Sequence, residues 1–211
     1  MSRLDRELRR VFGDPPEPPR AVVRVQVAAG QGLEAGREEG DRLVDAGADL
    51  VVLDADLPGP AALAAVAVLL DLEPVAVVGT APAEGWRQQV VAVRDLRRTA
   101  RPHAGDPVLL VQVLGDPAFG RVVGLLDRLA DRRTPVLLGG GTATAAAALV
   151  AARLQPGAEC RWLAGSAPAD AAGMGALAAV GLTPLLDLGL GPGSADVAVA
   201  VVRAGLELLG A

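Results

Sequence analysis

Turns rich in glycine and proline carry the residues of this chain whose types and spacing could do chemistry. The strongest signal is Gly139-Gly140-Gly141, followed by Thr142, which stands between the apolar run 135–138 and an alanine-rich stretch that reaches Leu154. Residues without a Cβ can adopt positive φ and let another molecule approach closely. The free N–H groups at the start of a helix favour an anion. The pattern therefore predicts a strand, a tight turn that receives a ligand, and a helix N-terminus.

Acid–base chemistry would need side chains from outside that turn, because no Lys, Arg, His, Asp or Glu lies between residues 134 and 153. Asp54 and Asp56 follow a buried apolar run and could bind a cation, although aspartates at such positions also cap turns. Asp187 and Asp196 stand on either side of the last glycine-rich turn. Either could act as a general base, or Asp187 could bond a neighbouring turn and Asp196 could stabilise a helix dipole.

Short apolar segments alternate with helical segments from residue 21 onward, and this alternation predicts the elements that position the turns. We expect strands over 49–53, 74–78, 135–138, 161–164 and 184–188, and helices over 34–46, 60–70, 85–98, 117–131, after the triple glycine, and over 171–180 and 194–209. Strands separated by helices form right-handed crossovers. The expected fold class is α/β, with a mostly parallel, Rossmann-like three-layer sheet and helices on both faces.

The segment 108–114 carries conflicting signals. Its β-branched residues favour a strand, whereas Asp106-Pro107 before it and Gly115 after it are typical of the two ends of a helix. We predict a short helix.

Ligands of a parallel α/β sheet collect at the carboxyl ends of the strands, where four of the turns fall. We expect one pocket lined by Asp54, Asp56, Gly59, Gly79, Thr80, Gly139, Gly140, Gly141, Thr142, Gly191, Gly193 and Ser194. The alternative is that glycine and proline at these turns only end the strands.

The first 20 residues form a separate unit in this interpretation, ahead of a domain over 21–211. Leu4, Leu8, Val11 and Phe12 recur at helical spacing, and the proline-rich segment 14–19 that follows is stiff and extended. This amphipathic helix could dock on the domain, on a second subunit, or on nothing.

Composition excludes several classes of partner. The formal net charge is −5, the pI is about 4.9 and aromatic residues make up 2%, which argues against nucleic acid and anionic membranes. Cys160 is the only cysteine and His103 the only histidine, so neither a disulfide nor a metal site is expected, and no cofactor is indicated. Apolar runs such as 61–70 are too short to span a bilayer, and the first residues lack a secretory pattern. We expect a cytoplasmic protein.

A long collinear stretch resembles the nicotinate-nucleotide:dimethylbenzimidazole phosphoribosyltransferase family. The resemblance rests on residues 134–157, on Trp162-Leu163-Ala164-Gly165 and on 181–190, with 47–50, 73–79, 85–86 and 93–95 in the same order before them. It runs from about residue 30 to the C-terminus. It implies a homodimer that transfers phosphoribosyl from nicotinate mononucleotide to a benzimidazole nitrogen, for the lower ligand of cobalamin.

The groups that this reaction requires are replaced at the matching positions. Residues 54–62 stand in place of the family's Gly-Glu-Met-Gly-Ile-Gly-Asn-Thr-Thr loop, and Gln89 stands where a lysine is expected. Ser166 replaces the histidine of a His-Arg pair and joins the expected pocket. Pro192 occupies the position of the catalytic glutamate, and proline cannot accept a proton. No catalytic residue is therefore assigned, and Asp196 is the weak candidate for a substitute base.

Three hypotheses remain open. The first is a degenerate member of the family that serves as a binding or partner subunit, as a homodimer or paired with a related phosphoribosyltransferase chain, and that binds a nucleotide or a benzimidazole. The second is an active phosphoribosyltransferase with altered groups. The third is a generic nucleotide-binding module, although the triple glycine lacks the spacing of a dinucleotide fingerprint.

Overall fold

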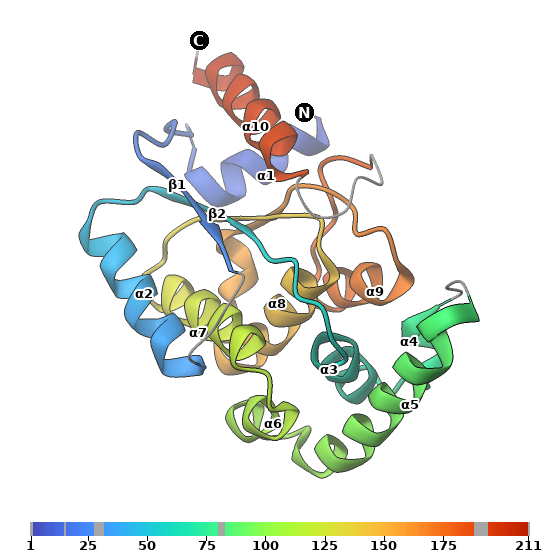
Figure 1. The fold of residues 1–211 in the computed structure, drawn as a ribbon. Helices are drawn as coiled ribbons and strands as arrows, with labels where there is room; N and C mark the ends of the chain where they lie inside the picture. Colours follow the sequence, from blue (N-terminus) through green and yellow to red (C-terminus); the bar gives the residue numbers. More distant parts are fainter. Residues whose placement is uncertain (1, 15, 28–31, 80–82, 188–193, 211) are drawn as a thin grey trace.

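Four short parallel strands form the sheet at the centre of the molecule, in the order β1-β2-β3-β4, and helices cover both of its faces (Figure 1). The computed structural model describes residues 2–14, 16–27, 32–79, 83–187 and 194–210. The strands are β1 (Val22–Gln26), β2 (Leu50–Asp54), β3 (Val136–Leu138) and β4 (Trp162–Ala164). The predicted α/β class with a parallel sheet is confirmed.

Helices make up most of the described chain. They are α1 (Arg3–Phe12), α2 (Leu33–Asp45), α3 (Ala61–Leu69), α4 (Pro74–Val78), α5 (Ala83–Ala100), α6 (Pro107–Leu114), α7 (Pro117–Asp131), α8 (Thr142–Leu154), α9 (Ala171–Val180) and α10 (Ala195–Gly210), with short 3-10 turns η1 (Arg101–His103) and η2 (Ala158–Arg161).

Alternation along the strands divides the core into two layers. Leu50 and Val52 of β2 face α1 and α10, whereas Val51 and Leu53 face the larger layer built by α3 and α6 to α9. Successive side chains of a strand point to opposite faces, so a strand covered on both faces must be apolar throughout. The run Leu50-Val-Val-Leu53 meets this requirement and is buried at every position.

One predicted strand is wrong, and another is present only in part. Residues 74–78 form helix α4, because Glu73 has an extended backbone and Pro74 occupies the first helical turn, where its missing N–H costs nothing. Their valines favoured a strand by propensity, which local geometry overrides. Within the predicted strand 184–188, the described residues contribute a single parallel bridge between Ser166 and Leu186. Strand β1, for which we predicted no element, forms the edge of the sheet beside β2.

Helix α6 confirms the prediction that capping outweighs β-branching in this segment. The Asp106 carboxylate accepts a hydrogen bond from the backbone N–H of Leu109 at 3.0 Å. Gly115 ends the helix in the left-handed conformation, with φ of 66°. Both ends carry the groups that satisfy free backbone donors and acceptors.

Helix α1 docks on the domain, which was one of the three alternatives left open by the sequence. Leu8 and Val11 are fully buried against α10 and the sheet. Arg10 donates hydrogen bonds to the carbonyl oxygens of Glu159 at 2.6 Å and Trp162 at 2.8 Å. The helix is thus fixed both by apolar packing and by contacts to the segment before β4.

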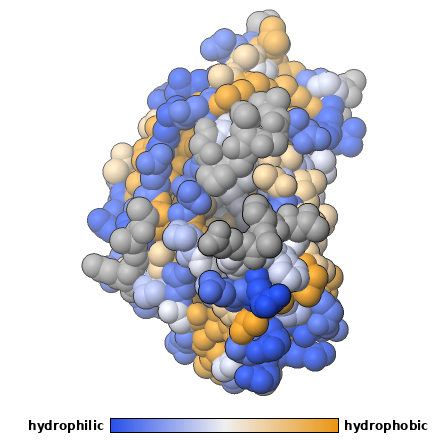
Figure 2. All heavy atoms as spheres, turned by 45° about the vertical axis from the view of Figure 1, so that its right-hand side comes forward, coloured by the Kyte–Doolittle hydropathy of each residue, from blue (hydrophilic) through white to orange (hydrophobic). Residues whose placement is uncertain are grey.

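The surface seen when the right-hand side of Figure 1 is turned forward mixes hydrophilic residues with separate hydrophobic patches (Figure 2). This is the side on which α4, α5 and α9 lie. Val75 of α4 and Met174 of α9 are among the exposed large apolar side chains, at 53% and 41%.

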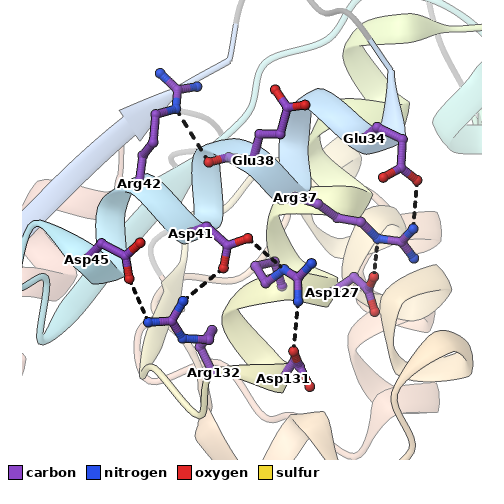
Figure 3. Close-up of polar contacts among 10 residues, drawn as sticks. Glu34, Arg37, Glu38, Asp41, Arg42, Asp45, Asp127, Asp131 and Arg132 are labelled. Atoms are coloured by element: carbon purple, nitrogen blue, oxygen red, sulfur yellow. Dashed lines mark hydrogen bonds and ion pairs between the residues drawn. The ribbon is translucent and has the colours of Figure 1, made fainter.

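Helices α2 and α7 pack with their backbones in close contact. A Cβ added to Gly36 would lie 2.1 Å from the Arg121 carbonyl oxygen, and one added to Gly124 would lie 1.9 Å from that of Leu33. Ion pairs line the same interface (Figure 3). Arg37 Nε lies 2.6 Å from the buried Asp127 carboxylate, and Arg132 bridges two aspartates of α2, Asp41 and Asp45.

The ion pairs of this interface raise the pKa values of two of its arginines. Burial alone would lower the pKa of Arg37, but the hydrogen bond and charge of Asp127 raise it above the ordinary value. Hydrogen bonds to Asp45 and Asp41 likewise raise the pKa of Arg132. Arginine is charged at any ordinary pH, so both guanidinium groups bring a positive charge to these contacts.

Candidate functional site

A cavity of about 250 Å³ lies at the carboxyl ends of β2 and β3. Two predicted turns build most of its wall, the one after β2 and the one that contains the triple glycine. Gln89 of α5 and Asp170 before α9 complete it. The lining residues are Ala55, Asp56, Leu57, Pro58, Gly59, Ala62, Leu63, Gln89, Gly140, Gly141, Thr142, Ala143, Ala169 and Asp170.

The triple glycine permits close approach, but at two of its positions the approaching group belongs to the same chain. A Cβ on Gly139 would lie 2.5 Å from the Asp54 carboxyl carbon, and one on Gly141 would lie 2.7 Å from the Ala55 carbonyl oxygen. Gly141 has φ of −81°, so the expected positive φ is wrong there. The Ala55 N–H also donates to Thr144 Oγ1 at 2.9 Å. The glycines therefore lock the turn onto the end of β2.

Helix α8 begins at this cavity with no side chain capping its N-terminus. The Asp170 carboxylate lies beside this end of the helix and accepts hydrogen bonds from the Thr142 hydroxyl and, at 2.8 Å, from the Gly173 backbone N–H. Asp170 thereby caps α9 and places a negative charge beside the start of α8. This negative charge opposes the attraction that the N-terminus of α8 would otherwise exert on an external anion.

The electrostatic character of the cavity is acidic. Asp56 and Asp170 contribute carboxylates, and no Lys, Arg or His occurs among the described residues that line it. The whole sequence contains no lysine, so every basic side chain other than His103 is an arginine. The cavity offers acceptors, the Gln89 amide and backbone N–H groups, but no cation.

The structure brings together part of the predicted pocket. Asp56, Gly59, Gly140, Gly141 and Thr142 line the cavity. Asp54 and Gly139 pack on each other below it.

The other predicted pocket residues lie elsewhere or outside the described residues. The Gly79 carbonyl accepts from Trp86 Nε1 at 2.6 Å and ends α4. Ser166 is fully buried at the bridge to Leu186, and Ser194 is buried just before α10. Thr80, Gly191, Pro192 and Gly193 lie outside the described residues.

Neither predicted substitute base lines the cavity. Asp196 forms an ion pair with Arg24 of β1 at 2.5 Å, and its side chain is 65% exposed. Asp187 is exposed after the bridge at Leu186. The pairing of Asp196 with an edge strand gives it a structural role in addition to its place in the first turn of α10.

Among the wall residues that were not predicted for the pocket, Gln89 and Asp170 are the two with polar side chains. The signal for Asp170 was present, because Gly165-Ser-Ala-Pro-Ala-Asp170 is a further turn after a strand and ends on a helix-capping residue. The signal for Gln89 was its place where the resemblance puts a lysine, since a glutamine on a polar helix does not by itself indicate the surface that it faces.

No group of three or more His, Cys, Asp or Glu side chains is placed to hold a metal ion in the part of the chain that the structure describes. Within the same residues, no helix combines the length and apolar character needed to cross a membrane.

Comparison with known proteins places this architecture in a family. The model of the family DBI_PRT, described as phosphoribosyltransferase, matches residues 21–210. The nicotinate-nucleotide–dimethylbenzimidazole phosphoribosyltransferase of Mycobacterium tuberculosis is 43% identical over 186 residues, 84% of this chain and 51% of the relative. The enzyme of the same name from Corynebacterium efficiens is 38% identical over 188 residues, 85% of this chain and 50% of the relative.

A solved structure shows the same fold. The crystal structure of CobT from Thermus thermophilus superposes with a TM-score of 0.75 at 32% identity, over 84% of this chain and 55% of that one. The chain spans about half the length of the curated relatives it matches. From the extent of the family match and the identity to these relatives, we conclude that the chain belongs to the nicotinate-nucleotide–dimethylbenzimidazole phosphoribosyltransferase family.

Proposed function

We propose that this chain is a binding or partner subunit of its family, whose cavity holds an uncharged nitrogen base and which does not by itself transfer phosphoribosyl. The observation that carries the proposal is the pair of carboxylates, Asp56 and Asp170, in a cavity wall without a cation among its described residues. A heterocyclic N–H can donate to a carboxylate, whereas a phosphate cannot.

Magnitudes favour the base over the nucleotide. Two unit charges about 4 Å apart interact by about 1 kcal/mol in water and about 4 kcal/mol near a protein surface. A helix N-terminus stabilises a nearby anion by only about 0.3–1 kcal/mol. Repulsion from the two aspartates therefore outweighs attraction by α8. The volume of about 250 Å³ also lies below the range of about 300–1,000 Å³ usual for small-molecule pockets, which suits a base better than a nucleotide.

The sequence supports the loss of catalysis independently. Residue 192, where the resemblance places the family's glutamate, is a proline, and the expected lysine is Gln89. Proton removal from the attacking nitrogen and neutralisation of the phosphate would both lack their usual groups.

The test is a pair of titrations and one assay on the purified chain. We expect 5,6-dimethylbenzimidazole to raise the thermal unfolding temperature, nicotinate mononucleotide to leave it unchanged, and the two together to release no nicotinate. Asp56→Asn should weaken binding of the base, and Glu207→Gln, which removes an exposed carboxylate on α10, should not. Nicotinate release that requires the benzimidazole would contradict the proposal and favour an active transferase.

The partner role rests on a separate observation. Val75 and Met174 are exposed apolar side chains on α4 and α9, and these helices contact each other, so both belong to one side of the domain. We propose that a second chain, either a copy of this one or a related phosphoribosyltransferase, covers that side. Light scattering of the purified chain, alone and mixed with such an enzyme, should report a dimer mass in at least one case, and Met174→Glu should reduce it. A monomer in both cases would contradict this part of the proposal.

A further inference from the structure

A second and larger cavity opens at the opposite end of the sheet, beside the amino ends of β3 and β4. Its volume is about 490 Å³. The end of α7 supplies Asp131 and Arg133, and the connection from α8 to β4 supplies Gln155, Cys160 and Arg161. None of these residues lines the cavity at the carboxyl end.

Helix α1 holds one wall of this cavity in place. Arg161 Nη1 donates to the Val11 carbonyl oxygen at 3.0 Å, which fixes one end of the guanidinium. Arg10 of the same helix bonds the Glu159 and Trp162 carbonyl oxygens on either side. The remaining N–H groups of Arg161 are thus carried on a braced side chain.

The two arginines of the cavity bring uncompensated positive charge. Neither Arg133 nor Arg161 forms an ion pair with another residue in the described parts of the chain, whereas Arg128 engages Asp131 at 2.9 Å. Other arginines at the ends of α7 and α5 have carboxylate partners, among them Arg128, Arg132 and Arg97.

The backbone at Arg133 is fixed by the end of α7, because its N–H donates to the Ala130 carbonyl oxygen and the Thr134 N–H donates to that of Leu129, both at 2.9 Å. Two non-glycine residues in the described chain have positive φ, Asp71 at 50° and Arg133 at 55°. Each lies directly after the residue that caps the C-terminus of a helix. Asp71 follows Leu70 at the end of α3, and Arg133 follows Arg132 at the end of α7. Glycine is the residue that this position favours, and other residues there are strained.

The comparison of these two positions indicates what Arg133 lacks. Asp71 is held by Arg97 at 2.9 Å and by Arg101 at 3.3 Å, so its charge is compensated within the chain. Arg133 occupies the equivalent position, faces a cavity, and has no carboxylate partner in the described residues. An anion from outside the chain would complete the arrangement.

We propose that this cavity binds a phosphate-bearing small molecule through Arg133 and Arg161, with the Gln155 amide as a further donor. Guanidinium groups bind phosphate oxygens in pairs of parallel hydrogen bonds, which makes arginine suited to this ligand class. The site is independent of the proposed base-binding cavity, and either can fail without the other.

Isothermal titration of the full chain with inorganic phosphate and with pyrophosphate tests the site. We expect pyrophosphate to bind more tightly than phosphate, because it can reach both guanidinium groups. Arg133→Gln and Arg161→Gln should each weaken pyrophosphate binding by at least about tenfold. Arg203→Gln is the matched control and should change nothing, because Arg203 is exposed on α10 and forms no ion pair with the residues that the structure describes.

A glycine variant separates binding from a structural role. Arg133→Gly should abolish pyrophosphate binding and at the same time raise the thermal unfolding temperature, because glycine relieves the strain of the left-handed backbone. A residue kept for stability would show the reverse. Pyrophosphate should also slow alkylation of Cys160 by iodoacetamide in the unaltered chain and not in Arg133→Gln.

Three results would overturn the proposal. They are pyrophosphate binding weaker than about 10 mM, binding that survives Arg133→Gln, and an equal loss in Arg203→Gln. Arg161→Gln removes the bond to Val11 and could disturb the fold, so Arg133→Gln, which leaves the main-chain bonds intact, decides the outcome.

Discussion

The two ends of the parallel sheet carry cavities of opposite charge. At the carboxyl end, Asp56 and Asp170 face a cavity whose described wall has no cation. At the amino end, Arg133 and Arg161 face a cavity whose one carboxylate, Asp131, is already paired. Ligands of open α/β sheets usually bind at the carboxyl ends, where helix N-termini favour anions.

The contrast shows that topology fixes where a cavity forms, while a few side chains fix what it can bind. The turns after β2 and β3 meet because parallel strands end at one edge. Their chemistry depends on residues that the topology leaves free to vary, such as Asp170 beside the start of α8. An anion site can then arise at the other end, where the fold alone does not favour one.

The largest expected effect comes from Leu8→Ala, which should loosen the packing of α1 and weaken ligand binding at one cavity but not at the other. Leu8 is fully buried between α1 and α10, and truncating such a leucine costs about 2–5 kcal/mol of unfolding free energy. Urea denaturation should show this loss. Because α1 braces only the amino-end cavity, pyrophosphate binding should weaken while binding of the benzimidazole remains. Equal weakening of both would contradict the separation of the two sites.

Gly141→Ala should disturb the carboxyl-end cavity instead. The new Cβ would meet the Ala55 carbonyl oxygen at 2.7 Å, and relieving such a contact costs about 1–3 kcal/mol. Gly175→Ala on α9, where the nearest atom is 3.6 Å away, is the control and should be neutral or stabilising. Chemical denaturation measures both, and we expect pyrophosphate binding to survive in each variant.

Asp56→Arg should convert the acidic cavity toward anion binding. Asp56 is exposed, so the replacement requires no repacking. In an Arg133→Gln background, where the amino-end site is silent, we expect affinity for inorganic phosphate to rise roughly tenfold, or about 1.4 kcal/mol. Glu207→Arg makes the same change in net charge on α10 and should not have this effect. No gain in Asp56→Arg would show that charge does not govern ligand choice at this end.

The smallest effect concerns the start of α1. Hydrogen bonds from the Ser2 hydroxyl and backbone N–H lower the pKa of the Asp5 carboxyl below its ordinary value of 3.8. Because the pKa is lower in the folded state, the ionised carboxylate stabilises the fold above pH 3.8. This stabilisation is lost as the pH falls through the pKa of the folded state. Asp5→Asn should therefore be less stable than the unaltered chain near neutral pH, with the difference closing in acid. Urea denaturation at several pH values measures it, and a gap that persists in acid would contradict the assignment.

Capping signals decided how much of the fold could be predicted. Asp106-Pro107 and Gly115 identified α6 despite its valines, whereas the similar Glu73-Pro74 at the start of α4 was outweighed by Val75, Val77 and Val78 in the prediction. Both segments obey the same rule, since proline is tolerated in the first turn of a helix. The difference is that glutamate gives no side-chain cap here, so its sequence signal is weaker.

The site was predictable as far as topology determines it. Asp56, Gly59, Gly140, Gly141 and Thr142 line the cavity because they follow neighbouring strands. Asp170 had a capping signal after a strand, but its bond to Thr142 is a tertiary contact. The place of Arg133 beside a cavity likewise depends on tertiary structure that no spacing along the chain encodes.

The contact between α2 and α7 restricts how this protein can vary. Gly36 and Gly124 face carbonyl oxygens at distances that no Cβ can occupy, while the outer face of α2 meets solvent and most of α7 is buried. A saturation library of the two helices should therefore tolerate many residues along the exposed face of α2 and return almost only glycine at these two positions. The close contact therefore excludes every larger residue at both positions, and an alignment of close relatives can be searched for glycine at each of them.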